Sequence, residues 1–297
     1  MTLNEELFLV SQKLVFVVGS PRSGTTWLQR LLAAHPKIHT GQESGLFDAY
    51  IGPQLRVWRR DLDTSTSGRA GIGMGCYLTE DQFMEILKGY LLQLMQPMLE
   101  GVGNSELFLE KTPSHALFLP EIMELLPNSR IIFILRDGRN VVASLLAASK
   151  SWGSYWAPSN PRYAAAMWRQ HVEAVRRIAP VLPQRQFIEV RYESLVQSPN
   201  TTLRSVFDFL GFDCNDKEIE DFIQLNQIGS EGTPIQLNGE VKKSAGSILR
   251  EPEGFVRKGQ AGKWSDNLSW LERLMVWRAI RRTMNEVGYP WRFPWMK

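Results

Sequence analysis

The sequence is poor in cysteine. It has two, Cys76 and Cys214, which lie far apart and form no C-x-x-C pair. A disulfide framework needs more cysteines at closer spacing, and a chain with few scattered thiols is typical of a reducing compartment. We therefore expect no structural disulfide.

Long hydrophobic runs are also missing. No apolar stretch approaches the roughly 20 residues that span a membrane. Residues 1–13 include Glu5 and Glu6 and lack the basic cluster that opens a secretory signal. These features favour a cytoplasmic protein with no membrane partner.

A strong net charge is absent as well. The chain has 34 Lys and Arg against 31 Asp and Glu, a formal charge of +3. This excess is too small to indicate a nucleic-acid partner, and it matters only where cations cluster. No internal repeat or low-complexity tract is visible.

What the sequence does have is an alternation of short apolar runs and helical patterns. Residues 14–18, 131–135 and 186–190 are typical of buried parallel strands. Helical spacing is present over 25–34, 79–98, 120–126, 140–149, 163–179, 201–210 and 268–287. This order predicts an α/β fold, a single domain over residues 1–297 with a central parallel sheet flanked by helices.

Three stretches lack a clear period and are expected to be irregular lids. They lie at about 50–78, 151–162 and 228–254, and long irregular segments in a compact domain are usually lids, binding loops or disorder. The aromatic residues in the first two could stack on an acceptor or pack the core: Trp58, Trp152, Tyr155 and Trp156.

The first motif, residues 19–27 (GSPRSGTTW), joins the first strand to the first helix. Backbone N–H groups in such a turn, together with the positive end of the helix, form an anion site. The spacing nearly matches the nucleoside-triphosphate loop G-x-x-x-x-G-K-[ST], but Thr25 stands in place of its lysine and Arg22 lies inside the loop. The motif predicts phosphate binding of another kind, with an ordinary glycine-containing turn as the alternative.

The second motif is Arg136 with Ser144 eight residues later. Arg136 follows a buried strand, where open α/β sheets bind ligands, and Ser144 lies two turns into the next helix. A guanidinium and a hydroxyl suit a second phosphate. The alternative is a surface arginine beside a helix-packing serine.

The third motif, residues 255–264 (FVRKGQAGKW), has two adjacent cations followed by glycine. Arg257 and Lys258, with the flexible Gly259, could close over an anion. A solvated basic loop is the alternative.

Together the three motifs resemble the PAPS-dependent sulfotransferase family, nearer to its branch with arginine in the PRSGTT loop. The resemblance implies that PAPS (3′-phosphoadenosine 5′-phosphosulfate) is the co-substrate and 3′,5′-ADP the product. Because a sulfuryl group carries less charge than a phosphoryl group, protein cations can replace Mg²⁺, and we expect no metal. It assigns the 5′-phosphosulfate to Arg22, Ser23, Gly24, Thr25, Thr26 and Trp27. Arg136 and Ser144 correspond to the 3′-phosphate site, Tyr192 lies near that phosphate or the adenine, and Arg257, Lys258 and Gly259 correspond to the nucleotide clamp.

Sulfuryl transfer parallels phosphoryl transfer as an in-line displacement, in which Arg22 would offset charge on the leaving phosphate. The resemblance also places Lys111 beside the sulfuryl group. Two residues are candidates for the base that activates the acceptor. Glu43 matches the catalytic glutamate of the carbohydrate and tyrosyl branches, and His115 lies four residues after Lys111.

The acceptor is expected to be a small molecule or a carbohydrate bearing a hydroxyl or an amine. Three alternatives stay open: a P-loop kinase or NTPase, a non-catalytic nucleotide-binding module, and sulfation followed by elimination. The oligomeric state is open too.

Overall fold

The computed structural model describes residues 2–66, 73–227 and 264–293. Five strands form one sheet in the order β2-β3-β1-β4-β5, and every neighbouring pair is parallel. Their bounds are Leu14–Gly19 (β1), Ile38–Thr40 (β2), Leu107–Glu110 (β3), Arg130–Leu135 (β4) and Phe187–Arg191 (β5). The α/β fold with a central parallel sheet is therefore as the sequence predicts.

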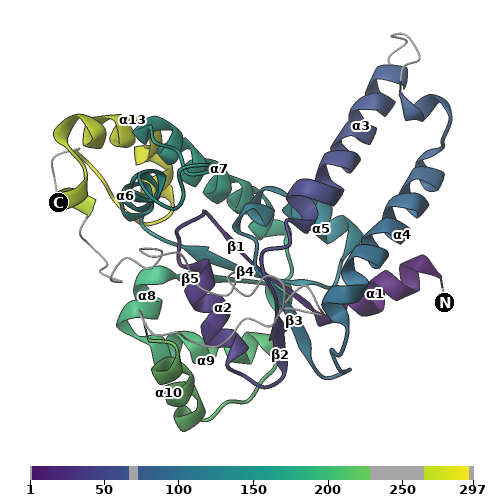
Figure 1. Cartoon of the computed structure of the whole chain (residues 1–297), viewed down its shortest axis with the longest axis horizontal. Coiled ribbons are helices and arrows are strands. Elements are labelled where there is room, and N and C mark those ends of the chain that lie inside the picture. The colour runs from purple at the N-terminus through teal and green to yellow at the C-terminus, as the bar shows by residue number, and fades with distance from the viewer. Residues whose placement is uncertain (1, 67–72, 228–263, 294–297) are drawn as a thin grey trace.

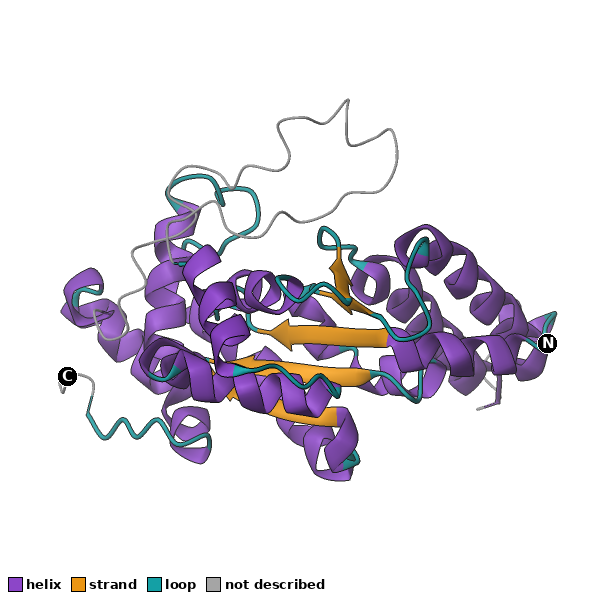
Figure 2. Cartoon of the chain, turned by 90° about the horizontal axis from the view of Figure 1, so that it is seen from below, coloured by secondary structure: helices purple, strands orange, loops and turns teal. Residues whose placement is uncertain are grey.

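Helices cover both faces of this sheet (Figure 2). Alternate side chains of β1 explain the two layers, since Val15 and Val17 pack into one core and Phe16 and Val18 into the other. The first core is completed by α2 (Thr25–Ala33), α8 (Tyr192–Gln197), α9 (Pro199–Leu210) and α10 (Asp216–Leu225). The second core is completed by α1 (Leu3–Lys13), α4 (Glu80–Leu99), α5 (Leu119–Leu125), α6 (Gly138–Ser149), α7 (Pro161–Ile178), α12 (Trp264–Asn267) and α13 (Trp270–Glu286).

Local sequence fixes where several of these helices start. Four of them begin with a capping box, in which a side chain before the helix and one in its first turn satisfy each other's backbone N–H groups. The pairs are Thr2 with Glu5, Thr79 with Gln82, Asn215 with Glu218, and Ser269 with Glu272. Asp137 caps α6 directly after β4, so the strand passes into the helix through a short turn.

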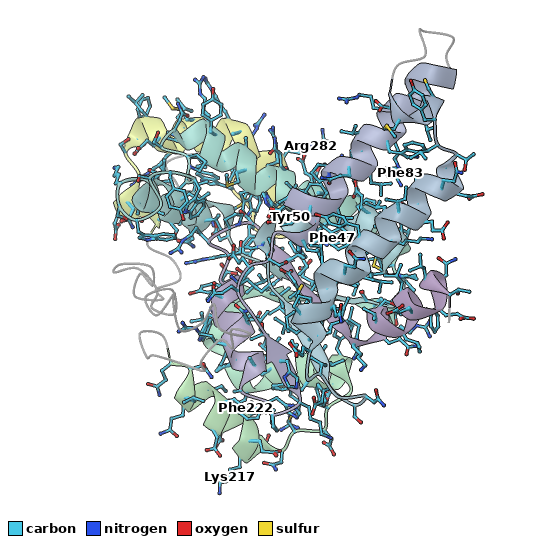
Figure 3. All side chains as sticks on the ribbon, turned by 45° about the vertical axis from the view of Figure 1, so that its right-hand side comes forward. Phe47, Tyr50, Phe83, Lys217, Phe222 and Arg282 are labelled. Atoms are coloured by element: carbon cyan, nitrogen blue, oxygen red, sulfur yellow. The ribbon has the colours of Figure 1, made fainter. Side chains whose placement is uncertain are left out.

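Much of the segment expected to be irregular at 50–78 is helical. A π-helical turn, η1 (Leu46–Ile51), runs into α3 (Gly52–Thr66), and α3 and α4 project from the body as a helical arm (Figure 1). Trp58 of α3 stacks on Phe83 of α4 with ring centroids 4.2 Å apart, and Figure 3 shows Phe83 on this arm. Leu55 and Trp58 are buried at helical spacing, a signal that the neighbouring glycine-rich run obscured.

The other two expected lids differ in outcome. Residues 151–157 form turns and α7 begins at Pro161, so the segment 151–162 is irregular over most of its length. Residues 228–254 lie outside the described residues. None of the described helices is long and apolar enough to cross a membrane.

Candidate active site

The candidate residues gather at the carboxyl edge of the sheet. Since all five strands are parallel and about 4.8 Å apart, the residues that follow them meet at one edge. In spatial order these are Glu43 after β2, Lys111 after β3, the loop of Arg22 after β1, Arg136 after β4 and Tyr192 after β5. These five candidate residues thus comprise one carboxylate, three cations and an aromatic ring.

The loop after β1 has a backbone that a nucleotide loop requires. Arg22 adopts a left-handed conformation with φ 71°, and Gly24 follows at φ 100°. The Ser23 N–H donates to the Ser20 carbonyl at 3.1 Å, which closes the turn in front of α2. The first amides of α2, at Thr25 and Thr26, have no partner within the helix and suit an anion.

Arg22 and Arg136 lie together. Arg136 Nη1 donates to the Arg22 carbonyl at 3.0 Å, and Arg22 Nε donates to Ser144 Oγ at 3.1 Å. The sequence pairs Ser144 with Arg136, whereas in the structure this hydroxyl contacts Arg22. The Arg136 side chain thus contacts the loop that carries Arg22, and we call these two arginines, which follow β4 and β1, the cationic cluster.

Aromatic rings pack against both arginines of this cluster. The Arg136 guanidinium lies 4.0 Å from the Tyr192 ring centroid, and Trp27 meets the same ring edge-on at 6.0 Å. The Arg22 guanidinium lies 5.1 Å from the ring of Trp152, which in turn touches Trp156. Trp152 is thus beside the loop, while Trp58 is buried in the arm.

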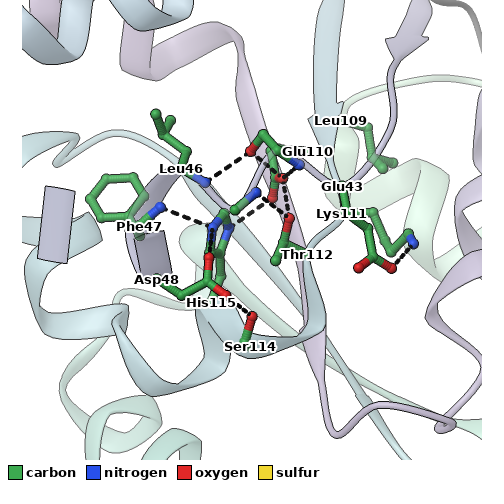
Figure 4. A network of polar contacts seen from close by, with 12 residues as sticks. Glu43, Leu46, Phe47, Asp48, Leu109, Glu110, Lys111, Thr112, Ser114 and His115 are labelled. Atoms are coloured by element: carbon green, nitrogen blue, oxygen red, sulfur yellow. Dashed lines mark hydrogen bonds and ion pairs between the residues drawn. The ribbon is translucent and has the colours of Figure 1, made fainter. Parts of the chain in front are cut away.

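Glu43 and Lys111 form an ion pair across β2 and β3. Lys111 Nζ donates to Glu43 Oε1 at 2.5 Å. Figure 4 shows this contact. The lysine side chain is only 6% exposed, whereas that of Glu43 is 52% exposed. The carboxylate is therefore held by a buried cation and still open to solvent, where an acceptor could reach it.

His115 occupies a different environment. Its side chain is fully buried, Nε2 accepts from the Phe47 N–H at 3.0 Å, and Nδ1 lies 2.8 Å from Glu110 Oε2. Because Nε2 accepts, the ring proton belongs on Nδ1 and faces the carboxylate. Nε2 is engaged and Nδ1 is buried against Glu110, so His115 has no nitrogen to offer an acceptor.

Glu110 is a carboxylate that the sequence-based reading missed. Burial opposes its ionisation, but the neighbouring His115 and the hydroxyl donors Thr112 and Ser44 outweigh burial and lower the pKa of Glu110 to about 2. Its place directly before Lys111 at a strand end was the available signal. Glu193 was missed too; it accepts from the Asp137 N–H at 3.1 Å and holds the turn that carries Arg136.

Two remaining expectations are not decided by this geometry. Arg257, Lys258 and Gly259 lie outside the described residues. Within the described parts of the chain, no three His, Cys, Asp or Glu side chains converge as metal ligands would, and the absence of a metal requirement stays a prediction.

Fold and site together define an α/β protein with a P-loop-like strand–loop–helix turn and a group of arginines at the carboxyl edge of its sheet. A model described as the sulfotransferase family matches residues 15–216, which is more than half of the chain. The chain belongs to the sulfotransferase family. The resemblance first seen in three short motifs is thereby confirmed.

Two relatives and one solved structure show how close the likeness is. The protein-tyrosine sulfotransferase of Drosophila melanogaster is 24% identical over 239 residues, which are 80% of this chain and 44% of that protein. Protein-tyrosine sulfotransferase 1 of Homo sapiens is 23% identical over 251 residues, 84% of this chain and 63% of that protein. The alignments thus span about half to two thirds of these relatives.

The solved structure is mouse sulfotransferase SULT7A1 complexed with PAP. It matches with a TM-score of 0.58 and 16% identity over 96% of this chain and 90% of that one. At this identity the match establishes the fold.

Proposed function

We propose that this chain transfers a sulfuryl group from PAPS to an acceptor hydroxyl or amine and releases 3′,5′-ADP. The observation that carries the proposal is the Glu43–Lys111 pair at the sheet edge, where Lys111 directly follows β3, the strand next to β1 and its Arg22 loop. In a member of the sulfotransferase family this arrangement unites a candidate base with a phosphate site.

The residues present fit a doubly phosphorylated nucleotide. Arg136 Nε is buried and has no hydrogen-bond partner among the described residues, so it retains a donor for a ligand oxygen. Arg22, Arg136 and Ser144 would hold phosphate oxygens, the half-buried Trp27 offers a flat surface beside them, and the buried Tyr192 ring supports Arg136. Bound PAPS would supply the sulfuryl group, with a phosphate as leaving group.

Glu43 is the base that we propose. Its exposed carboxylate can accept the proton of an acceptor hydroxyl, whereas the buried His115 cannot reach one. Lys111 and Arg22 would offset negative charge at the reacting centre. Thr25 in place of a P-loop lysine, and the family match, favour this function over a kinase or a non-catalytic module.

A small molecule or a carbohydrate is the acceptor class that we propose, and Trp152 and Trp156 beside the loop suit the flat face of a ring. The names of the relatives add a tyrosyl hydroxyl of a peptide as a specific second candidate. We also propose a cytoplasmic location, because Cys76 and Cys214 are free thiols. Subcellular fractionation tests that location.

The decisive experiment is a panel of small-molecule, carbohydrate and tyrosyl-peptide acceptors with ³⁵S-labelled PAPS. We expect label transfer to at least one acceptor class. Mass spectrometry of the product separates stable sulfation from sulfation followed by elimination. If the unaltered, folded protein transfers label to none of these acceptor classes, the proposal is contradicted.

Glu43→Gln tests the base. It should lower turnover by about 10²–10⁴-fold, because the amide cannot accept a proton, and should leave the affinity for 3′,5′-ADP unchanged. Single-turnover kinetics and calorimetry measure the two quantities. A variant with normal turnover would move the base to another residue.

A further inference from the structure

The segment 110–115 makes several hydrogen bonds to the residues that directly follow Glu43. Glu110 ends β3, and the short helical turn at 113–117 brings His115 back toward it. Residues 44–47 include the first two residues of η1 and carry four consecutive backbone N–H groups, which no preceding helical turn can satisfy.

Side chains supply a partner for each of these four groups (Figure 4). Three of the acceptors come from the segment 110–115 and one from Ser44 itself. The contacts run from Ser44 N–H to Glu110 Oε1 (3.3 Å), Gly45 N–H to Thr112 Oγ1 (3.3 Å), Leu46 N–H to Ser44 Oγ (3.1 Å) and Phe47 N–H to His115 Nε2 (3.0 Å).

Glu110 organises all of these acceptors. Its Oε1 accepts from Ser44 Oγ at 2.7 Å and from Thr112 Oγ1 at 2.6 Å, which orients both hydroxyls, and its Oε2 faces His115 Nδ1. The proton on Nδ1 leaves Nε2 free to accept from Phe47. One buried carboxylate thus sets the donor and acceptor roles around residues 44–47.

We propose that Glu110 is a positioning residue: acting through Ser44, Thr112 and His115, it anchors the backbone next to Glu43 so that the Glu43 carboxylate meets Lys111. Lys111 directly follows Glu110, so the same anchor fixes both members of the ion pair. His115 belongs to this anchor. The inference deepens the proposed function and rests on it for the role of Glu43.

Glu110→Gln is the principal test. The glutamine amide nitrogen would replace one of the two carboxylate oxygens and would then face a donor, either at His115 Nδ1 or at Ser44 and Thr112. Since two donors cannot bond to each other, the anchor should loosen although the side-chain volume is kept. We expect kcat to fall about 10- to 100-fold while the Kd of 3′,5′-ADP stays unchanged. Amide hydrogen exchange over residues 44–47 should become about tenfold faster.

A second variant and a control make the result specific. Ser44→Ala removes the hydroxyl between Glu110 and the Leu46 N–H. It should lower kcat and speed the exchange of residues 44–47 as Glu110→Gln does, to a smaller extent. If Glu110→Gln does not fold, Ser44→Ala is the test. Glu121→Gln is the matched control, because Glu121 is a buried carboxylate on α5 that pairs with Arg56. It should leave kcat and the exchange of residues 44–47 unchanged.

Unchanged exchange at 44–47 in both test variants, or unchanged kcat, would overturn the inference. If the unaltered chain transfers sulfuryl to no acceptor but exchange responds as expected, the proposed function fails and the anchor stands. Equal exchange changes in Glu121→Gln would show a general loosening of the fold and would also overturn the inference.

Discussion

Glu43 and Glu110 are both carboxylates at the carboxyl edge of the sheet, but their surroundings separate their roles. Glu43 has one buried cation as partner and a side chain that is half exposed. Glu110 is enclosed by hydroxyls and an imidazole. An exposed carboxylate can exchange protons with an acceptor, whereas an enclosed one that stays ionised acts as a fixed hydrogen-bond acceptor.

The low pKa of Glu110 predicts an acid-sensitive fold. Since its pKa of about 2 lies below the ordinary 4.5, its ionisation stabilises the folded chain above pH 4.5, and this contribution is lost as the pH falls from 4.5 toward 2. The free energy of unfolding of the unaltered chain should therefore drop more steeply over this range than that of Glu110→Gln. Urea denaturation at several pH values measures both, and parallel profiles would contradict the prediction.

Gly24 is a residue whose replacement should be costly. Its φ of 100° disfavours any side chain, and a Cβ there would lie 2.6 Å from the Tyr192 ring. Gly24→Ala should lower stability by about 1–3 kcal/mol and weaken 3′,5′-ADP binding. Thermal denaturation and calorimetry measure these effects.

Gly89 provides the control for that substitution. It lies within α4, and a Cβ there would meet nothing within 4 Å. Gly89→Ala should raise stability by about 0.5–1 kcal/mol without a change in nucleotide binding. Equal effects of the two substitutions would rule out the conformational explanation for Gly24.

At the level of elements, two strand–turn–helix units form the cationic cluster. α2 packs on one face of the sheet and α6 on the other, so the chain leaves β1 and β4 in opposite directions. Ligands of open parallel sheets bind where neighbouring connections diverge in this way. Arg136 bridges the two units, because it holds the Arg22 carbonyl at 3.0 Å.

Removal of the Arg136 side chain should weaken nucleotide binding. Arg136→Ala should weaken 3′,5′-ADP binding about 10- to 100-fold, since charge-assisted contacts contribute about 1.5–3 kcal/mol each, and should not move the pH optimum. Calorimetry and a pH–rate profile are the measurements. Arg185→Ala, at the amino end of β5, removes an exposed arginine from the opposite edge and should bind normally.

At the level of the whole molecule, the site is built by five separate strand ends, while the arm of α3 and α4 extends away from it (Figure 1). Phe222 and Lys217 on α10 lie at the far end of the molecule from Phe83 on the arm (Figure 3). Because the strand ends at this edge lead into helices on both faces of the sheet, a ligand bound there should raise the stability of the whole fold.

This arrangement predicts a specific thermal response. At a hundredfold excess over its Kd, 3′,5′-ADP should stabilise the chain by about 2.7 kcal/mol, and Mg·ATP should have little effect, because Thr25 replaces the lysine of an ATP-binding loop. Differential scanning calorimetry measures both. Stronger stabilisation by Mg·ATP would favour the kinase alternative.

The sequence anticipated the elements whose signals are local. The buried runs of β1, β4 and β5 and the long helices carry their periodicity within one window of residues. β2 and β3 were not predicted, since three and four residues are too few to show a pattern, and α3 was hidden by the glycine-rich run after it.

The amino-acid sequence by itself determined the family and the residue types of the proposed nucleotide site, because a phosphate loop requires its glycines and cations at fixed spacing along one continuous segment. Only the tertiary structure showed that Glu43 is exposed beside Lys111 while His115 is buried, and revealed the contacts of Glu110. The hydrogen-bond partners of these residues come from segments 66 residues apart in the chain, which the pairing of β2 with β3 brings together.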